Sequence, residues 1–317
     1  MKAAIINAYG PPEVLQIMEV PTPNINKNEI LVKVKAVAVT SADTRIRGAR
    51  FPKGFGFFAR MFFGVTKPRV HILGSTFSGV VEAVGSDVTA FQIGDEVCGM
   101  TGVKMGTYAE CIKITKPSSL VRKPAKVSHE EAAGAMFGGT AALYFVRDIL
   151  DVKSNEEVII NGASGAVGTN AVQLAKYFGA NVTGVTSGSN AKIVRDLGAD
   201  KIIDYTKQDL AYSKEKYDVV LDTVGNISPS SAKKVLRKNG RAGLMVTNLG
   251  DTLRAHGQVK TGTATEKTED IEFLLSLMEQ GFLKTIIDRK YDFNSIVEAH
   301  KYVDSGQKIG NVILLFK

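Results

Sequence analysis

Residues 158–168 read VIINGASGAVG, and this stretch decides the fold of the chain. An apolar strand runs into a turn that contains Gly162, Gly165 and Gly168, and a helix is predicted over 165–178. A diphosphate can approach the N–H groups at a helix N-terminus only where side chains do not block it. A GxxGxxG triplet alone is weak evidence, but here it has the strand–turn–helix context that a dinucleotide site needs. We therefore predict cofactor contacts from Ser164, Gly165, Ala166 and Val167.

The end of the next predicted strand indicates which dinucleotide binds. An Asp or Glu that binds the ribose is expected about 20 residues past the glycines, and Ser187 stands there instead. A carboxylate would repel a 2′-phosphate, whereas hydroxyl groups and Lys192, with Arg195 nearby, would attract it. An ordinary polar turn with Ser189 as a helix N-cap has the same pattern, and both interpretations can hold together. We expect NADPH in preference to NADH.

Strands and helices alternate through the middle of the chain. Strands are predicted over 157–160, 181–186, 201–204, 219–222 and 242–246, and helices over 129–150, 165–178 and 191–197, the first of them broken near Gly138-Gly139. This alternation indicates a parallel sheet with helical crossovers, a Rossmann doubly wound sheet. Ligands of such sheets lie at the carboxyl ends of the strands. Further cofactor contacts are therefore predicted at Tyr205, Val224, Met245, Val246, Thr247 and Asn248.

The two ends of the chain have a different pattern of predicted secondary structure. Short strands are predicted over 3–7, 15–20, 30–39, 80–84, 96–98 and 108–114, which is typical of a compact β-barrel-like domain. After a helix over 269–280, strands over 285–291 and 311–316 flank a helix over 295–303. We expect the α/β domain, residues 123–284, to interrupt a β domain made of residues 1–122 and 285–317.

Composition limits the classes of protein that the chain can belong to. Of 317 residues, 44% are hydrophobic and 23% charged, and the two cysteines, Cys98 and Cys111, form no CxxC pair. A disulfide scaffold or a structural zinc site is therefore not expected, and a reducing cytoplasm is the simplest compartment. The apolar runs are too short to span a membrane, so no membrane partner is expected. The net charge is +8, but the cations form no block, so nucleic acid is not an expected partner either.

Several motifs together resemble the medium-chain dehydrogenase/reductase superfamily. The similar segments run almost from end to end: KAA (2–4), GPPEVL (10–15), 34–43, GVVEAVG (79–85), GDEV (94–97), GTAA (139–142), 162–168, LGAD (197–200) and GNV (310–312). The resemblance implies a GroES-like β-barrel domain and a Rossmann NADP-binding domain, with catalysis in the cleft between them. It also implies a homodimer, for which the stretch 241–246 is a plausible edge strand.

The zinc-ligand positions of this superfamily are changed in this chain. Zinc-dependent alcohol dehydrogenases carry a Cys before the Asp of the early catalytic segment, where this chain has Thr40-Ser41-Ala42-Asp43. They carry Gly-His-Glu where this chain has Gly74-Ser75-Thr76. Catalytic zinc needs three N, S or O ligands, so no metal is expected. The four histidines, His71, His129, His256 and His300, are expected in turns or on helix surfaces.

Candidate catalytic donors follow from the same comparison. The quinone oxidoreductases that this chain resembles have Asn and Tyr where it has Thr40 and Arg45. Arg45 would contact cofactor phosphate or a substrate oxygen, or it would be an exposed charge at a strand end. Tyr108 is a second candidate donor, with barrel packing as the alternative. Thr140 resembles the threonine that the family places beside the nicotinamide, and a helix cap is the alternative.

Residues 51–63 are rich in phenylalanine, with Phe58, Phe62 and Phe63 expected on one face of a short helix. This segment is either a lid over a pocket for a lipophilic substrate or packing at a loop or subunit interface.

These observations predict an NADPH-dependent, metal-free oxidoreductase that transfers hydride to a small lipophilic quinone, enone or alkenal. A metal-free carbonyl or alcohol dehydrogenase is the second hypothesis. A non-catalytic, cofactor-bound binding protein is the third, and only the basic charge supports it.

Overall fold

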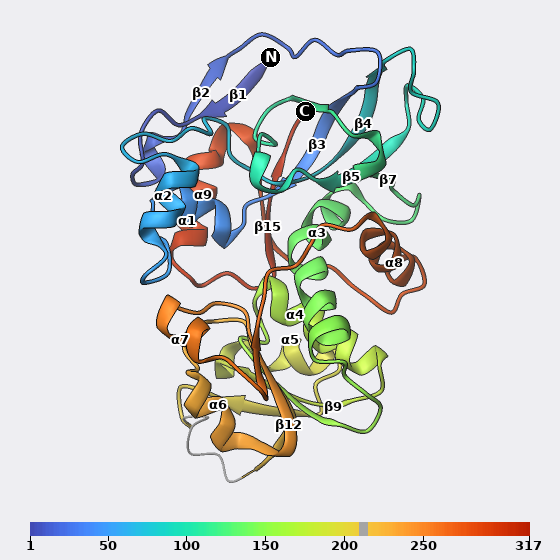
Figure 1. Cartoon of the computed structure of the whole chain (residues 1–317). Helices are drawn as coiled ribbons and strands as arrows, with labels where there is room; N and C mark the ends of the chain where they lie inside the picture. The colour runs from blue at the N-terminus through green and yellow to red at the C-terminus, as the bar shows by residue number, and fades with distance from the viewer. Residues whose placement is uncertain (209–214) are drawn as a thin grey trace.

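The computed structural model describes residues 1–208 and 215–317, which contain two large β-sheets, each in its own domain (Figure 1). The first sheet has the order β14-β15-β3-β4-β5-β7, and β6 also pairs with β3. A separate hairpin joins β1 to β2. The strands of this domain are β1 (Lys2–Ile5), β2 (Gln16–Glu19), β3 (Ile30–Ala38), β4 (Thr76–Val84), β5 (Glu96–Met100), β6 (Cys111–Ile114), β7 (Leu120–Arg122), β14 (Ile287–Asp292) and β15 (Asn311–Leu315).

The second sheet is parallel throughout, with the order β10-β9-β8-β11-β12-β13. This is the strand order of a Rossmann doubly wound sheet, so the predicted fold class is confirmed. Its strands are β8 (Glu157–Asn161), β9 (Asn181–Thr186), β10 (Lys201–Asp204), β11 (Tyr217–Asp222), β12 (Leu236–Leu244) and β13 (Val259–Thr261).

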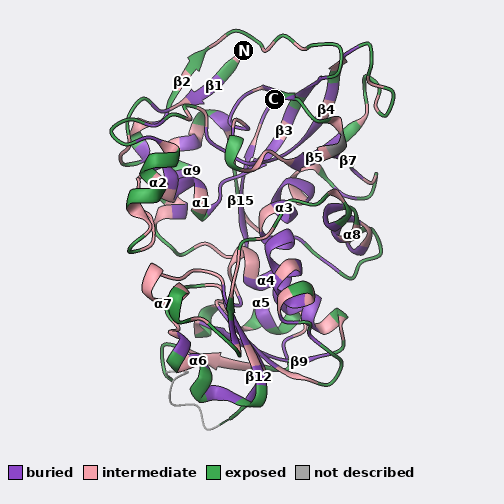
Figure 2. Ribbon diagram, in the orientation of Figure 1, coloured by how far each residue is buried: buried purple, intermediate pink, exposed green. Residues whose placement is uncertain are grey.

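Helices cover the sheets and cross between the domains (Figure 1). They are α1 (Ser41–Arg47), α2 (Gly56–Phe63), α3 (His129–Leu143), α4 (Ala166–Tyr177), α5 (Ala191–Asp196), α6 (Pro229–Val235), α7 (Leu249–Arg254), α8 (Thr268–Glu279) and α9 (Ile296–Asp304). Within residues 1–208 and 215–317, no helix is long and apolar enough to cross a membrane. Apolar residues of each sheet form the two main cores, and Figure 2 shows the strands mostly in the colour of buried residues.

The C-terminal strands return the chain to the first domain. Strand β15 pairs antiparallel with β3, placing Ile313 opposite Ala38, and β14 pairs with β15. The buried positions of β15 join the core that β3 and β4 form. The end of the chain is therefore part of the first sheet, although the α/β domain separates the two in sequence.

The predicted break near Gly138-Gly139 is wrong, because α3 runs unbroken from His129 to Leu143 and continues into a π-helical turn, Tyr144–Ile149. A Cβ atom added to Gly138 would lie 2.5 Å from the carbonyl oxygen of Ala166 at the start of α4. The glycine therefore lets two helices pack closely and does not end the first one.

The predicted edge strand over 241–246 is also wrong. Strand β12 ends at Leu244 and lies between β11 and β13, so β13 is the outer strand among the described residues. Ala242 and Leu244 are buried, and pairing on both sides satisfies their backbone groups. The homodimer stays a prediction, without this strand as its interface.

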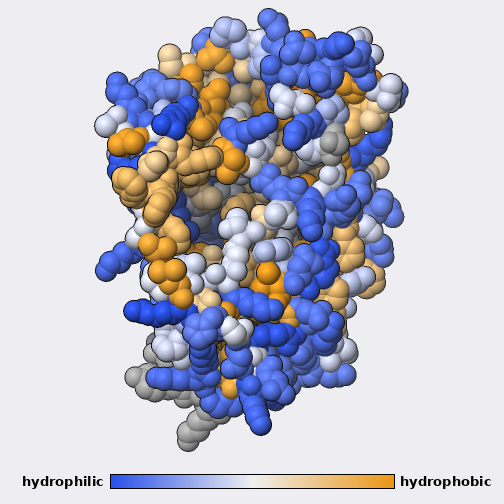
Figure 3. All heavy atoms as spheres, in the orientation of Figure 1, coloured by the Kyte–Doolittle hydropathy of each residue, from blue (hydrophilic) through white to orange (hydrophobic). Residues whose placement is uncertain are grey.

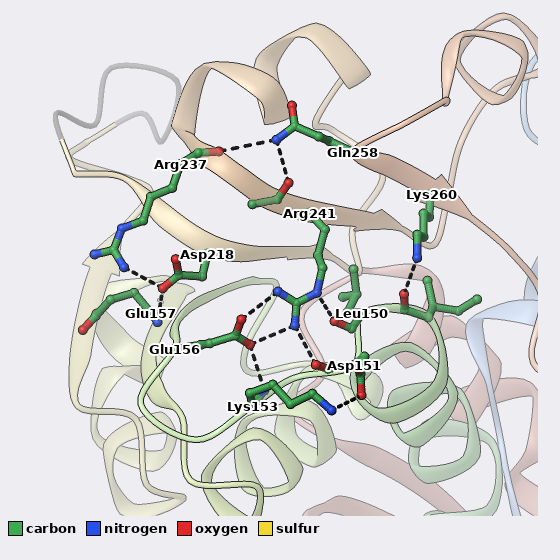
Figure 4. A network of polar contacts seen from close by, with 12 residues as sticks. Leu150, Asp151, Lys153, Glu156, Glu157, Asp218, Arg237, Arg241, Gln258 and Lys260 are labelled. Atoms are coloured by element: carbon green, nitrogen blue, oxygen red, sulfur yellow. Dashed lines mark hydrogen bonds and ion pairs between the residues drawn. The ribbon is translucent and has the colours of Figure 1, made fainter.

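A polar network fixes β12 against the loop before β8 (Figure 4). The guanidinium of Arg241 donates to both carboxylate oxygens of Glu156, each over 2.8 Å, and to the carbonyl oxygens of Leu150 and Asp151. Nearby, Arg237 pairs with Asp218 over 2.6 Å. Two-pronged Arg–carboxylate pairs combine charge with fixed geometry, so this network holds the loop and strand in register.

Candidate active site

A cavity of about 460 Å³ lies in the cleft between the two sheets. Its first wall comes from α1 and the end of β3, with Thr40, Arg45 and Ile46. Its second wall comes from α3, from the start of α4 and from the residues that follow β11 and β12. The carboxyl ends of central Rossmann strands therefore face the barrel domain across this space, where ligands of such sheets bind.

The glycine-rich turn has the shape that a diphosphate requires. Gly162 has φ +80°, and a Cβ on Gly168 would lie 2.0 Å from the carbonyl oxygen of Gly162, so both positions need glycine. A Cβ at Gly165 would meet only one atom, at 3.5 Å, which leaves open space in front of α4. The first N–H groups of α4 have no partner inside the helix. The turn therefore fits the diphosphate of a dinucleotide.

The predicted diphosphate contacts divide into two groups. Gly165, Ala166 and Val167 line the cavity. Ser164 is not among the residues that line the cavity. Its hydroxyl accepts a hydrogen bond of 2.9 Å from Thr186 at the end of β9. Ser164 therefore ties the turn to the neighbouring strand.

The predicted adenosine end lies beyond β9 and β10. The Ser187 hydroxyl is 2.9 Å from that of Ser189, and the Lys192 ammonium pairs with Asp196 over 2.6 Å while its side chain is 86% exposed. Tyr205, at the end of β10, is exposed. Exposed pairs one turn apart are weak, so Lys192 is free to turn toward a phosphate.

Asp204 is an acidic residue that sequence reasoning missed in this region. It ends β10, and a Cβ at Gly188 would lie 2.6 Å from its carboxylate. The hydrogen bond from the Thr206 hydroxyl lowers the pKa of this carboxyl. No sequence signal near Ser187 identifies Asp204, because Asp204 lies on the neighbouring strand β10, where it pairs with Thr186 of β9.

The predicted nicotinamide end contains Thr140, Met245 and Val246, which line the cavity together. The Thr140 hydroxyl donates to the carbonyl oxygen of Met136 over 2.7 Å, in the interior of α3. The alternative of Thr140 as a helix cap is therefore wrong.

The other residues predicted after the Rossmann strands lie outside the cavity lining. Asn248 caps α7 and accepts from the N–H of Asp251 over 2.9 Å, and the Thr247 hydroxyl lies 2.7 Å from that of Thr252. Val224 is half-exposed beside Gly162. These residues do follow the ends of β11 and β12, as predicted. The side chains of Thr247 and Asn248, however, make hydrogen bonds at the start of α7.

Thr40 and Arg45 both line the cavity, but they differ in whether their hydrogen-bond donors are free. Thr40 caps α1, and its hydroxyl donates to Asp43 over 2.6 Å, so its proton is already engaged. Arg45 has no carboxylate partner among the described residues. Burial lowers the pKa of its guanidinium, and the neighbouring charge of Arg50 lowers it further. Arg45 is therefore the group with hydrogen-bond donors to offer.

Tyr108 does not reach the cavity. Its ring is fully buried in the barrel core, edge-on to His300 with 5.5 Å between ring centroids. Burial raises the pKa of its hydroxyl well above the usual value, and the charge of Asp43 raises it further. This placement corresponds to barrel packing, the alternative that the sequence left open.

No three His, Cys, Asp or Glu side chains gather as potential metal ligands in the part of the chain that the structure describes. His300 differs from its expected place on a helix surface: it is fully buried, with Nδ1 3.1 Å from the guanidinium of Arg47. Burial lowers the pKa of His300 to about 3, so the ring is neutral near pH 7. His300 therefore packs inside the barrel domain.

Two ionisable cavity residues were missed by sequence reasoning. Lys308 is partly buried, and its ammonium donates to the carbonyl oxygen of Gly310 over 2.6 Å. Burial lowers its pKa to about 8. Glu266 lies on the cavity wall near Gly102, and burial raises the pKa of its carboxyl. The only sequence signal was that Lys308 precedes the family-like Gly310-Asn311-Val312.

Known proteins share both domains. Residues 26–148 match the alcohol dehydrogenase GroES-like domain, and residues 197–314 match the model described as zinc-binding dehydrogenase. A 2-methylene-furan-3-one reductase of Solanum lycopersicum is 30% identical over 99% of this chain and 79% of its own length. A quinone oxidoreductase of Pseudomonas aeruginosa is 28% identical over 97% of both chains.

Solved structures agree with this assignment. The quinone oxidoreductase from Coxiella burnetii superposes with a TM-score of 0.90 at 28% identity, covering 100% of this chain and 99% of the other. Escherichia coli quinone oxidoreductase complexed with NADPH superposes with a TM-score of 0.84 at 26% identity, covering 100% of both. With its GroES-like barrel and its Rossmann nucleotide site, the chain belongs to the medium-chain dehydrogenase/reductase superfamily and is an NAD(P)H oxidoreductase of the quinone oxidoreductase-like type.

Proposed function

We propose that this protein uses NADPH to reduce a small lipophilic quinone or an activated C=C bond, as in an enone or alkenal, without a metal. The observation that carries the proposal is Arg45, a cation that lines the cleft with no carboxylate partner among the described residues. Apolar side chains, among them Val39, Phe63 and Phe137, form much of the remaining wall. Such a cavity suits a lipophilic substrate with one oxygen to be bound.

Bound NADPH would supply a hydride to the electron-poor carbon of the substrate. Negative charge then develops on the conjugated oxygen, and the guanidinium of Arg45 is placed to donate hydrogen bonds to it. A proton must follow the hydride to complete the two-electron reduction. Glu266 is a candidate source, because it lies on the cavity wall and the pKa of its carboxyl is raised above the usual value.

The cofactor's groups have partners in this chain as well. The start of α4 offers backbone N–H groups to the diphosphate, and the Lys308 ammonium adds a positive charge on the same cavity. The Thr140 hydroxyl keeps an acceptor site free for the carboxamide of the nicotinamide, because its proton is donated to Met136.

The names of the relatives favour this function over the alternatives, since they include quinone oxidoreductases and an enone-type reductase. A metal-free carbonyl or alcohol dehydrogenase is the second candidate, because the same cavity would hold an aldehyde. A cytoplasmic location stays a prediction, since relatives also include chloroplastic and mitochondrial proteins.

The test is NADPH oxidation with quinones, alkenals, enones and aldehydes, with and without a chelator. We expect stoichiometric turnover of a quinone or enone that survives chelation. Arg45→Met should lower kcat/KM at least tenfold, because a charged hydrogen bond contributes about 1.5–3 kcal/mol. Arg254→Met, at an exposed arginine of α7, is the control that should leave kcat/KM unchanged. Alcohol oxidation with NADP and no quinone or enone turnover would support the second candidate instead.

A further inference from the structure

Helix α2 carries an apolar face that nothing in the described chain covers. Four of its side chains and one residue after it are each between 53% and 71% exposed: Phe57, Phe58, Met61, Phe62 and Val65, here called the aromatic patch. At about 100° per residue, the four helical members share one side of α2. Figure 2 shows the outer side of α2 as exposed, and Figure 3 shows apolar side chains gathered over it. Contiguous exposed apolar surface of this kind marks an interaction site.

The opposite side of α2 is anchored, so the exposed face is held in place. Phe63 lines the cleft cavity and stacks on Phe51, with 6.0 Å between ring centroids. Phe51 in turn packs against the barrel core. The Tyr9 hydroxyl donates to the carbonyl oxygen of Gly64 over 2.8 Å, at the end of the helix. The aromatic patch therefore borders the mouth of the cavity.

The charges of the segment that carries the aromatic patch are of one sign. Residues 44–81 contain seven Lys or Arg and no Asp or Glu, although the net charge of the whole chain is only +8. Two of these cations, Arg47 and Arg50, pair with Asp304. Lys53 and Lys67 are exposed and have no ion pair among the described residues.

Two arginines lie at the border of the patch and keep their charge available. Arg60 donates to the carbonyl oxygen of Val65 over 2.7 Å, and Arg69 reaches that of Phe62 over 3.5 Å. Neither meets a carboxylate among the described residues. A border of cations around aromatic side chains is complementary to one class of surface, an apolar layer beneath anionic headgroups.

We propose that this face docks on the surface of an anionic lipid bilayer, with the aromatic patch inserted among the headgroups and the four cations at the phosphates. Surface binding needs no membrane-spanning helix. Docking in this orientation would bring the mouth of the cavity to the bilayer, where lipophilic substrates dissolve. The lipid contact itself does not depend on the proposed reductase activity.

The experiment is co-sedimentation of the full chain with vesicles of phosphatidylcholine alone and of phosphatidylcholine with phosphatidylglycerol. We expect binding to the anionic vesicles, at least tenfold weaker binding to the neutral ones, and loss of binding at high salt. Phe58→Ser with Phe62→Ser should weaken binding at least tenfold. Phe282→Ser removes a phenylalanine that is 57% exposed in the other domain, and it should leave binding unchanged.

The charge contribution is tested separately with Lys53→Gln and Lys67→Gln, which should also weaken binding. Their control is Lys153→Gln with Lys201→Gln, at exposed lysines of the Rossmann domain. Absence of binding to anionic vesicles, or binding that the Phe58/Phe62 variant retains, would overturn the proposal. So would an oligomer in lipid-free solution that this variant splits, because a second copy would then cover the patch. NADPH turnover measured on the same samples reports on the reductase function independently.

Discussion

The backbone N–H of Gly310 donates a hydrogen bond of 2.8 Å to the carbonyl oxygen of Ser164. Ser164 belongs to the glycine-rich turn, and Gly310 directly precedes β15 of the barrel sheet. Gly310 has φ +61°, and a Cβ there would lie 2.3 Å from the carbonyl oxygen of Ile286. The cofactor turn is thus joined directly to the barrel, and the approach needs glycine. The same contact brings Lys308 to the cavity wall that holds Gly165.

Lys308→Met should raise the Kd for NADPH about tenfold, because a cation facing a diphosphate contributes about 1.5–3 kcal/mol. The pKa of Lys308 is about 8 in the cofactor-free protein. The wild-type chain should therefore lose affinity as the pH rises from about 7 to about 9 and the ammonium loses its proton. Titration of nucleotide fluorescence at several pH values measures both effects.

Lys301→Met is the control for this prediction, since Lys301 is an exposed lysine that pairs with Glu13. It should bind NADPH as the wild type does, with the same pH dependence. If Lys308→Met also keeps the wild-type affinity and pH slope, Lys308 does not meet the diphosphate.

NADPH should bind at least tenfold more tightly than NADH, since one charge-assisted phosphate contact contributes about 1.5–3 kcal/mol. Lys192→Glu should remove or reverse this preference, because it replaces an ammonium with a second carboxylate near Asp196, and carboxylates repel a 2′-phosphate. Calorimetry with the two nucleotides measures the ratio of dissociation constants. Lys153→Glu, at an exposed lysine paired with Asp151, should not change that ratio, and equal Kd values for the wild type would contradict the prediction.

Arg241→Met should lower the free energy of unfolding by about 2 kcal/mol, because it leaves the Leu150 carbonyl oxygen without this donor and the Glu156 carboxylate with the Lys153 N–H in place of its two-bond arginine partner. Arg237→Met breaks a more exposed pair with Asp218, and it should cost less than about 1 kcal/mol. Urea denaturation of the cofactor-free proteins compares the two. Equal losses would mean that the partly buried network around Arg241 adds nothing beyond a surface pair.

The glycine-rich turn and the alternation of strands and helices were predictable because both are local patterns. Residues 158–168 carry their strand, turn and helix start within one short stretch. Gly138 was misread because its glycine serves a contact with Ala166 in another helix, and nothing near it in sequence records that contact. Lys308 was missed for the same reason: the contacts that bring it to the cleft, the pairing of β15 with β3 and the bond from Gly310 to Ser164, join residues far apart in sequence. Tyr108 was ambiguous because a strand tyrosine can face either the core or a ligand.

Thr140→Val tests where the nicotinamide lies. The Thr140 hydroxyl donates to Met136, and Thr140 lines the cavity together with Met245 and Val246, so its oxygen can still accept a bond from the carboxamide. Loss of one neutral hydrogen bond changes a rate about threefold to tenfold, so kcat with a quinone should fall by that factor. The unfolding free energy should change by less than about 1 kcal/mol, because valine has nearly the same shape. Thr140→Ser keeps the hydroxyl and should retain most of the turnover; if Thr140→Val does so too, the hydroxyl serves only α3, and the nicotinamide lies farther along the cleft, toward Arg45.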